Sequence, residues 1–316
     1  MINADKVSLW KDDVQASVAL YNSWFFAAAP QAYRDTRQAT IDQVKHAFTV
    51  TRNMLELTPS VLAAEPVIIS PLRMMTAPPI ARDRLIGLAG LKSSNMVKTM
   101  ERNQLPPRMS QVELMSELGL MCSTIERLVD RDLLSWVPES RTPDQDEVAL
   151  AAMVVADRLC GAVADPIIRN AQEQRQLAVI AEYLDALGYE KKPYSGQLPL
   201  AGMPRGTYSF RQVVSVGSDN NINMPIDVVI QPENGHPSGL PVLIECKSAG
   251  DFTNTNKRRK EEAQKVHQLR DRYGDTVPFY LFLNGYFDAG YLGYEAAEGI
   301  DWIWEHRLDD LMELGL

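Results

Sequence analysis

The sequence predicts a protein of the mixed α/β (α+β) class, in which a mixed β-sheet flanked by helices follows an all-helical N-terminal region. In residues 1–150, apolar side chains recur every three or four positions, which is the period of an amphipathic helix. Residues 151–316 instead alternate helical patterns with short apolar runs that are typical of strands. We therefore expect two domains, 1–150 and 151–316.

The N-terminal region contains three amphipathic stretches, 5–28, 33–57 and 110–135. Five prolines interrupt residues 59–79, which predicts a break in the helical structure there. Residues 80–103 follow as two short helical patterns separated by a turn that contains glycine. This arrangement resembles a helix-turn-helix motif.

The C-terminal region contains a helix, three strands, a second helix and two further strands, in that order. The first helix is predicted to begin at Pro166 and to end at Gly188, because proline favours helix starts and glycine favours helix ends. The predicted strands are 208–216, 225–230, 241–250, 277–287 and 300–306, and the second helix covers 257–274.

Charged side chains interrupt two of these strands. Asp227 lies in the run PIDVVI, and Glu245 and Lys247 lie in the run PVLIECKSAG. Side chains alternate along a strand, so Glu245 and Lys247 share one face, and pairing of the two strands would bring Asp227 to them. Charged groups are rarely buried unless they are paired or bind a metal ion. The pattern indicates either a metal centre or a structural ion pair.

A metal centre would relieve the repulsion between two carboxylates in a poorly solvated site. Mg²⁺ prefers oxygen ligands, and we expect Mn²⁺ to substitute for it. Asp227, Glu245 and the backbone carbonyl of Cys246 are the expected ligands; Glu173, on the inward stripe of the first helix, is a further candidate unless it is a capping or surface residue. Lys247 would position or deprotonate an attacking water and stabilise negative charge.

The order of the elements, with D…ExK on two neighbouring strands, resembles the PD-(D/E)xK nuclease superfamily. Asp227 and Glu245 are 18 residues apart, which suits two strands joined by a loop. Here Pro225 is separated from Asp227 by one residue, a small departure from the superfamily pattern.

A more specific resemblance extends from Trp10 to the C-terminus. Several segments are similar to the XamI family of type II restriction endonucleases, namely TAPPIARDRLIGLAG (76–90), VADRLCGAVADPIIRNAQEQRQL (155–177), PIDVVIQP (225–232), ECKSAGDFTNTNKRRKEEA (245–263) and GYLGYEAAEGIDWIWEHRLDDL (290–311). The resemblance implies Mg²⁺-dependent cleavage of double-stranded DNA at a short palindromic site, with an expectation of a GTCGAC-type site. A palindromic site favours a homodimer, because a two-fold protein matches a two-fold site.

The helix-turn-helix pattern offers one set of DNA contacts. Asn95, Lys98, Thr99 and Arg102 would lie on the open side of its second helix, where Asn and Arg suit base edges and Lys suits phosphate. Residues 78–108 carry six basic and two acidic residues, so this segment could meet phosphate. The alternative is a helical hairpin that packs on its neighbours and exposes its charges to solvent.

A second set of DNA contacts follows the Glu-x-Lys strand and comprises Asn254, Asn256, Lys257 and Arg258. Positive charge at the start of a helix opposes the helix dipole, so the basic run favours an anionic partner such as DNA. The alternative is a solvated helix face.

Composition and motifs limit the class of protein further. The net charge of −9 argues against a passive DNA-coating protein, and the acidic segment 276–316 would face away from DNA. The three cysteines fit neither a disulfide framework nor a zinc site, and no apolar run is long enough to span a membrane. The sequence contains no phosphate-binding loop typical of ATPases. We expect a cytoplasmic enzyme that does not use ATP.

Two other functions stay open from the sequence. A repair or structure-specific nuclease could use the same core, and a DNA-binding protein could retain an inert nuclease fold. Three intact charged residues argue against the inert fold, since it has no need to keep them buried.

Overall fold

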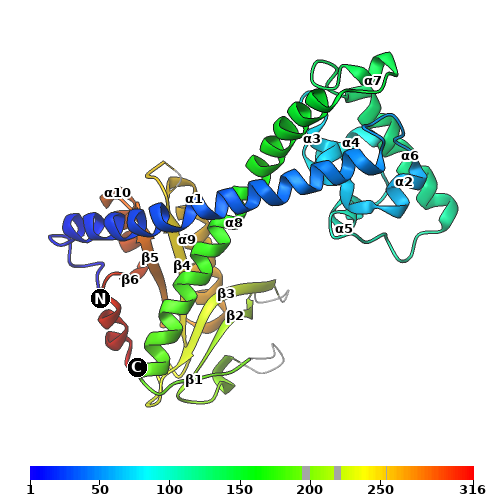
Figure 1. Ribbon diagram of the computed structural model, residues 1–316. Coiled ribbons are helices and arrows are strands. Elements are labelled where there is room, and N and C mark those ends of the chain that lie inside the picture. Colours follow the sequence, from blue (N-terminus) through cyan, green and yellow to red (C-terminus); the bar gives the residue numbers. More distant parts are fainter. Residues whose placement is uncertain (194–199, 217–221, 254) are drawn as a thin grey trace. The chain divides into compact units, whose positions relative to one another are not determined.

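A computed structural model describes residues 1–193, 200–216, 222–253 and 255–316, without the side chains of 201, 222 and 256–259 (Figure 1). The chain forms two compact units. Unit 1 comprises Met1–Ala29 and Arg169–Leu316, and unit 2 comprises Pro30–Ile168. This division differs from the expected boundary at residue 150, because the first 29 residues belong with the sheet.

Two long helices contribute to both units: α1 spans Trp10–Val50 and α8 spans Gln145–Ala186. The amphipathic stretches 5–28 and 33–57 largely coincide with the single helix α1, which continues through Pro30. The predicted start at Pro166 is wrong, since Pro166 lies inside α8. A proline inside a helix costs about 3 kcal/mol. Buried apolar residues on both sides of each proline offset that cost.

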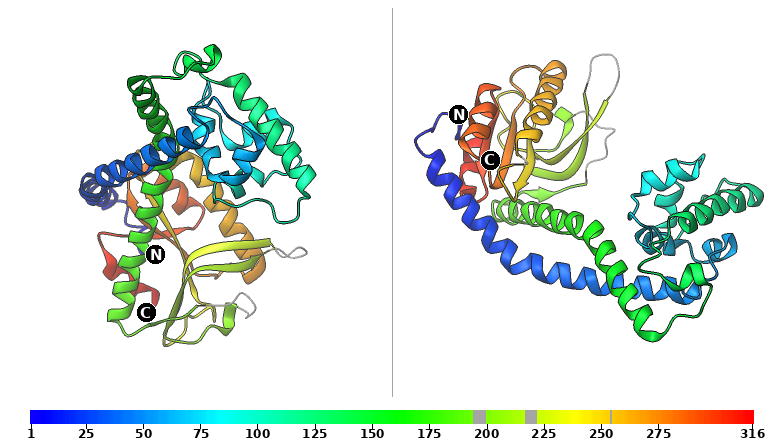
Figure 2. Two further views of the ribbon diagram at one scale, coloured as in Figure 1. Left: turned by 45° about the vertical axis from the view of Figure 1, so that its right-hand side comes forward. Right: turned by 90° about the horizontal axis from the view of Figure 1, so that it is seen from above.

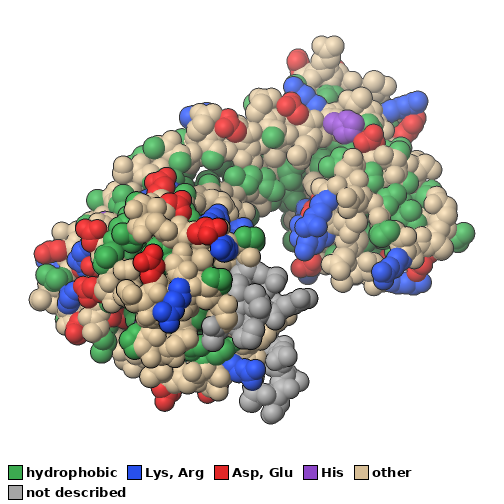
Figure 3. All heavy atoms as spheres, turned by 90° about the horizontal axis from the view of Figure 1, so that it is seen from below, with side chains coloured by type: hydrophobic (Ala, Val, Ile, Leu, Met, Phe, Trp, Pro, Cys, Tyr) green, Lys and Arg blue, Asp and Glu red, His purple; other side chains and the backbone are tan. Residues whose placement is uncertain are grey.

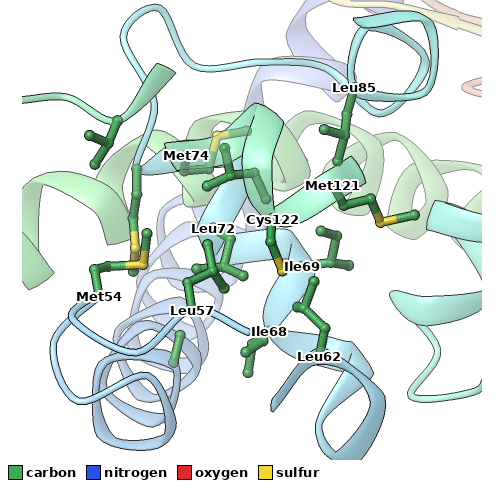
Figure 4. Close-up of a cluster of buried hydrophobic side chains, with 14 of the residues drawn as sticks. Met54, Leu57, Leu62, Ile68, Ile69, Leu72, Met74, Leu85, Met121 and Cys122 are labelled. Carbon is green, nitrogen blue, oxygen red and sulfur yellow. The ribbon is translucent and has the colours of Figure 1, made fainter. Parts of the chain in front are cut away.

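Unit 2 is helical and has its own hydrophobic core. Besides its parts of α1 and α8, it contains α2 (Pro59–Ala64), η1 (Pro66–Ile68), α3 (Ile69–Met74), α4 (Arg82–Ala89), α5 (Met96–Met100), α6 (Gln111–Leu128) and α7 (Trp136–Glu139). Figure 4 shows side chains of this core meeting from several of these elements, among them Leu62, Leu72 and Met121. The predicted helical N-terminal region is confirmed.

Unit 1 contains a six-stranded mixed sheet with the strands in sequence order. The strands are β1 (Glu190–Lys191), β2 (Thr207–Val216), β3 (Ile222–Gln231), β4 (Val242–Ala249), β5 (Phe279–Gly285) and β6 (Asp301–Trp304). The β2–β3 and β3–β4 pairs are antiparallel, and the other pairs are parallel. The predicted mixed sheet is therefore confirmed. The sequence patterns did not reveal the two-residue β1.

Helices cover both faces of this sheet. On one face, Val229 and Leu243 share a core with Val266 of α9 (Thr255–Tyr273) and with α10 (Ala289–Ala297), a helix that was not predicted. On the other face, Ile244 and its neighbours pack against α8. The right-hand view of Figure 2 shows the sheet between α8 and α9. Two short 3₁₀ helices, η2 (Leu200–Gly202) and η3 (Leu308–Leu314), complete the unit.

The N-terminus is tied to the last strand of the sheet by a buried carboxylate. Asp301 accepts hydrogen bonds from the backbone N–H groups of Ile2, Asn3 and Ala4, with distances of 2.9 Å for the last two. Asn3 in turn donates to the Trp302 carbonyl at 2.9 Å. These contacts explain why the first residues belong to unit 1, although they lie almost 300 positions before Asp301 in the sequence.

We predict that Asp301→Ala lowers the free energy of unfolding by about 2–4 kcal/mol, because three buried N–H donors lose their acceptor. Urea unfolding followed by tryptophan fluorescence measures this change. Asp275→Ala, at an exposed position, is the control and is expected to change the free energy by less than about 0.5 kcal/mol. Equal effects of the two variants would contradict the role of Asp301.

Candidate active site

The pairing of β3 with β4 ends where two acidic side chains lie. The last pair is Val228 with Ile244, and one further step of this antiparallel register places Asp227 opposite Glu245. There, the Cys246 N–H donates to Asp227 Oδ2 at 2.9 Å. Both carboxylates lie on the face that α9 covers, because they alternate with residues packed on α8. The end of the ladder therefore holds two carboxylates together.

Helix α9 brings two more charged residues to this pair. Lys247 Nζ lies 3.1 Å from Glu245 Oε1 and 3.2 Å from Glu262 Oε1. Lys265 Nζ lies 2.7 Å from the same Glu245 Oε1 and 3.1 Å from the Pro225 carbonyl oxygen. The site thus contains three carboxylates and two ammonium groups, contributed by two strands and one helix.

Burial and the neighbouring charges shift the pKa values at this site. Burial, followed by the repulsion of Glu245, raises the pKa of Asp227 to about 6. Burial alone would lower the pKa of Lys247, but the charges of Glu245 and Glu262 outweigh it, and the pKa lies above its ordinary value. Lys247 therefore stays protonated at neutral pH, which favours charge stabilisation over proton abstraction from water.

Two oxygen atoms of the site suit a cation. Glu245 Oε2 and Glu262 Oε2 are buried and accept no hydrogen bond from the described part of the chain. A buried carboxylate oxygen without a donor is costly, and a bound cation would remove that cost. Within the described ranges, no three His, Cys, Asp or Glu side chains form a ready metal cage. Mg²⁺ often takes one or two carboxylates and keeps several waters, so Asp227 and Glu245 fit it.

The other two candidate ligands, the Cys246 carbonyl and Glu173, lie on different sides of the catalytic strand. Along a strand, N–H and C=O of one residue point to the same side, so the Cys246 carbonyl shares the direction of its N–H, toward β3 and Asp227. Glu173 lies on α8, which packs on the opposite face of the sheet, and its Oε1 accepts a hydrogen bond from Arg211 Nη2 at 2.6 Å. Among the described residues, Glu173 pairs with Arg211, and its role as a ligand stays a prediction.

Sequence reasoning missed Glu262 and Lys265. Glu262 continues the apolar stripe of α9 that includes Val266 and Leu269, and it is only 1 % exposed. The same signal, a glutamate on the inward side of a helix, had pointed to Glu173 on α8. The sequence could not show which helix lies over the face that carries the carboxylates.

The predicted helix-turn-helix is a pair of short helices, α4 and α5. Asn95, Lys98 and Arg102 are exposed and Thr99 is half-buried, while Met96, Val97 and Met100 are buried, so the expected open side faces solvent. Thr99 Oγ1 donates to the Asn95 carbonyl at 2.9 Å. Helix α5 has only five residues, and Arg102 follows its end. The exposed side is short for a helix that reads a groove.

The second set of DNA candidates lies at the start of α9. Asn254 is outside the described residues. Asn256, Lys257 and Arg258 have described backbone within α9, but their side chains are not described.

The fold and the site together define a class of protein: a nuclease with an acidic pair and a lysine on adjacent strands of a mixed sheet. The XamI restriction endonuclease family matches residues 52–304, and the chain belongs to that family. It is therefore a restriction endonuclease, a site-specific deoxyribonuclease. Membership of this family argues against the two other functions considered from the sequence, a structure-specific nuclease and a DNA-binding protein with an inert nuclease fold.

The chain is also similar over its whole length to a curated protein. It is 60% identical over 315 residues to the type II restriction enzyme SalI of Streptomyces albus G, and the match covers all of both chains. No solved structure matches the chain. Restriction enzymes of this type generally require a divalent metal ion, in agreement with the buried oxygens at the site.

We predict that Asp227→Asn stabilises the metal-free protein above about pH 6 and has little effect near pH 4. The unfolded carboxyl loses its proton at its ordinary pKa of 3.8, and the folded one at about 6, so folding is penalised as pH rises between these values. The expected gain near pH 8 is about 1–3 kcal/mol. Urea unfolding with a chelator at several pH values measures it, and a loss of stability near pH 8 would contradict the raised pKa.

Proposed function

We propose that this protein is a type II restriction endonuclease that makes Mg²⁺-dependent double-strand cuts at a short palindromic DNA site of the GTCGAC type. The observation that carries the proposal is the meeting of Asp227, Glu245 and Lys247 at the open end of the β3–β4 pairing. The 60% identity to SalI over the full length of both chains supports the type of enzyme and the proposed DNA recognition site.

Asp227, Glu245 and the Cys246 carbonyl would hold the Mg²⁺ ion, for which Mn²⁺ would substitute. When bound, the ion would supply Lewis-acid activation of water and charge neutralisation at the phosphate. Asp227 and Glu245 lie opposite each other on β3 and β4, so both carboxylates are available to the same ion. Lys247, held between Glu245 and Glu262, directs a positive charge at the phosphodiester oxygens, where negative charge grows during hydrolysis.

For DNA contact we propose the exposed side of α5, with Asn95, Lys98, Thr99 and Arg102, and the start of α9, with Asn254, Asn256, Lys257 and Arg258. Within unit 2, Arg73 and Arg82 pair with Glu101, whereas Lys98 and Arg102 form no ion pair with the part of the chain that the structure describes. Figure 3 shows acidic and basic side chains interspersed on one face of the molecule. Contact with phosphate would therefore depend on individual basic side chains rather than on a broad positive surface.

We infer that the enzyme is a homodimer, because cutting both strands of a palindrome requires two equivalent centres. We also place it in the cytoplasm, beside a methyltransferase of a restriction–modification pair. Its three cysteines are free, which suits a reducing compartment. None of the helices in the described ranges combines the length and apolarity needed to cross a membrane.

The function is tested by digesting a long DNA of mixed sequence with Mg²⁺ and sequencing the fragment ends. We expect discrete fragments that share one terminal motif, and two protein chains per site by analytical ultracentrifugation with an oligonucleotide that contains it. A smear of fragments, or one chain per site, would contradict the corresponding part of the proposal.

Lys247→Met serves as the matched control for that digest. It keeps the aliphatic stem and removes the charge, so we expect cleavage to fall by at least about 100-fold while the circular dichroism spectrum is retained. Cleavage at the normal rate would show that Lys247 is not catalytic.

A contact with phosphate predicts a change in the salt dependence of DNA binding. Lys98→Ala is expected to lower the slope of log affinity against log salt by about one, because one phosphate contact is lost. A fluorescence anisotropy titration in a chelator measures the slope. Lys45→Ala, at an exposed position on α1, is the control, and an unchanged slope for Lys98→Ala would remove α5 from the interface.

A further inference from the structure

The two lysines of the active site are held unequally. Lys247 lies between two carboxylates, with Glu245 Oε1 at 3.1 Å and Glu262 Oε1 at 3.2 Å. Lys265 contacts one carboxylate, Glu245, and one neutral acceptor, the Pro225 carbonyl. Because ion pairs to carboxylates are stronger than hydrogen bonds to neutral carbonyls, Lys265 is the lysine that is more easily released.

Both ammonium groups use the same oxygen of Glu245. Oε1 has Lys265 Nζ at 2.7 Å and Lys247 Nζ at 3.1 Å, whereas Oε2 is buried without a hydrogen-bond donor from the described residues. A divalent cation on this carboxylate would stand close to two positive charges. Like charges at such distances repel each other in a poorly solvated site, and solvent screens only part of this repulsion.

We propose that Lys265 is the resident counter-cation of Glu245, and that a divalent metal ion binds in competition with it. The inference rests on the proposed metal site formed by Asp227 and Glu245. In the metal-free protein, Lys265 offsets the repulsion between these two carboxylates. On metal binding, its ammonium moves away from Glu245, and its 20 % exposed side chain gives it a route toward solvent. Lys265 is thus a positioning residue that sets the affinity of the site for metal.

Metal affinity without DNA tests this role separately from cleavage. Isothermal titration of the full-length protein with Mn²⁺ is expected to give about three- to tenfold tighter binding for Lys265→Met than for the wild type. Lys265→Arg keeps the charge and is expected to bind Mn²⁺ as the wild type does. A structural role for Lys265 would instead predict weaker binding when its contacts are lost.

Two further variants separate the local contact from overall charge. Lys260→Met removes a positive charge from an exposed position of α9, and we expect no change in Mn²⁺ affinity. Glu262→Gln removes a negative charge beside Lys247 and is expected to weaken Mn²⁺ binding, opposite to the effect of Lys265→Met. Should Lys265→Met fail to fold by circular dichroism, Lys265→Gln carries the same expectation and keeps a donor for the Pro225 carbonyl.

The outcomes distinguish this inference from the proposed function. If the wild type binds Mn²⁺ and the uncharged Lys265 variants bind it equally or more weakly, the counter-cation role is overturned and the metal site stands. If no variant and no wild-type protein binds Mn²⁺, the proposed metal site is overturned and the inference with it.

Discussion

The repulsion between Asp227 and Glu245 is the constraint around which unit 1 is organised. The register of β3 and β4 sets these carboxylates opposite each other at a largely buried site, where water screens them less than at the surface. Lys247 and Lys265 offset the repulsion, and Glu262 balances the charge of Lys247. Two buried carboxylate oxygens still lack a donor among the described residues, and this deficit is what suits the site to a cation.

The opposite face of the sheet fixes the backbone that carries these charges. Gln176 of α8 donates to the Lys247 carbonyl at 3.4 Å, and Gln172 donates to the Ser248 hydroxyl. Arg175 pairs with the buried Glu305, which also accepts a hydrogen bond from Asn284 at 2.6 Å. Helix α8 therefore supports the catalytic strand from behind.

Most of the sheet could be predicted from the sequence because its strands are short apolar runs bounded by turn residues. The strand that carries Asp227 and the strand that carries Glu245 and Lys247 were found within one to three residues of their observed bounds. Local patterns failed at Pro166, since packing along a long helix outweighs the local preference of proline. They also missed α10 and the 3₁₀ segments, which are short.

The sequence by itself determined the family, the mixed class of fold and the alternation that places Glu245 and Lys247 on one face of a strand. These features depend on residue identity and on the two-residue period of a strand, both of which are local. Only the tertiary structure decided that α9, rather than α8, covers the carboxylates, so that Glu262 and Lys265 join the site, whereas Glu173 pairs with Arg211. A sheet has two faces, and the helix that packs on each is set by chain topology, which the periodicity of a helix does not encode.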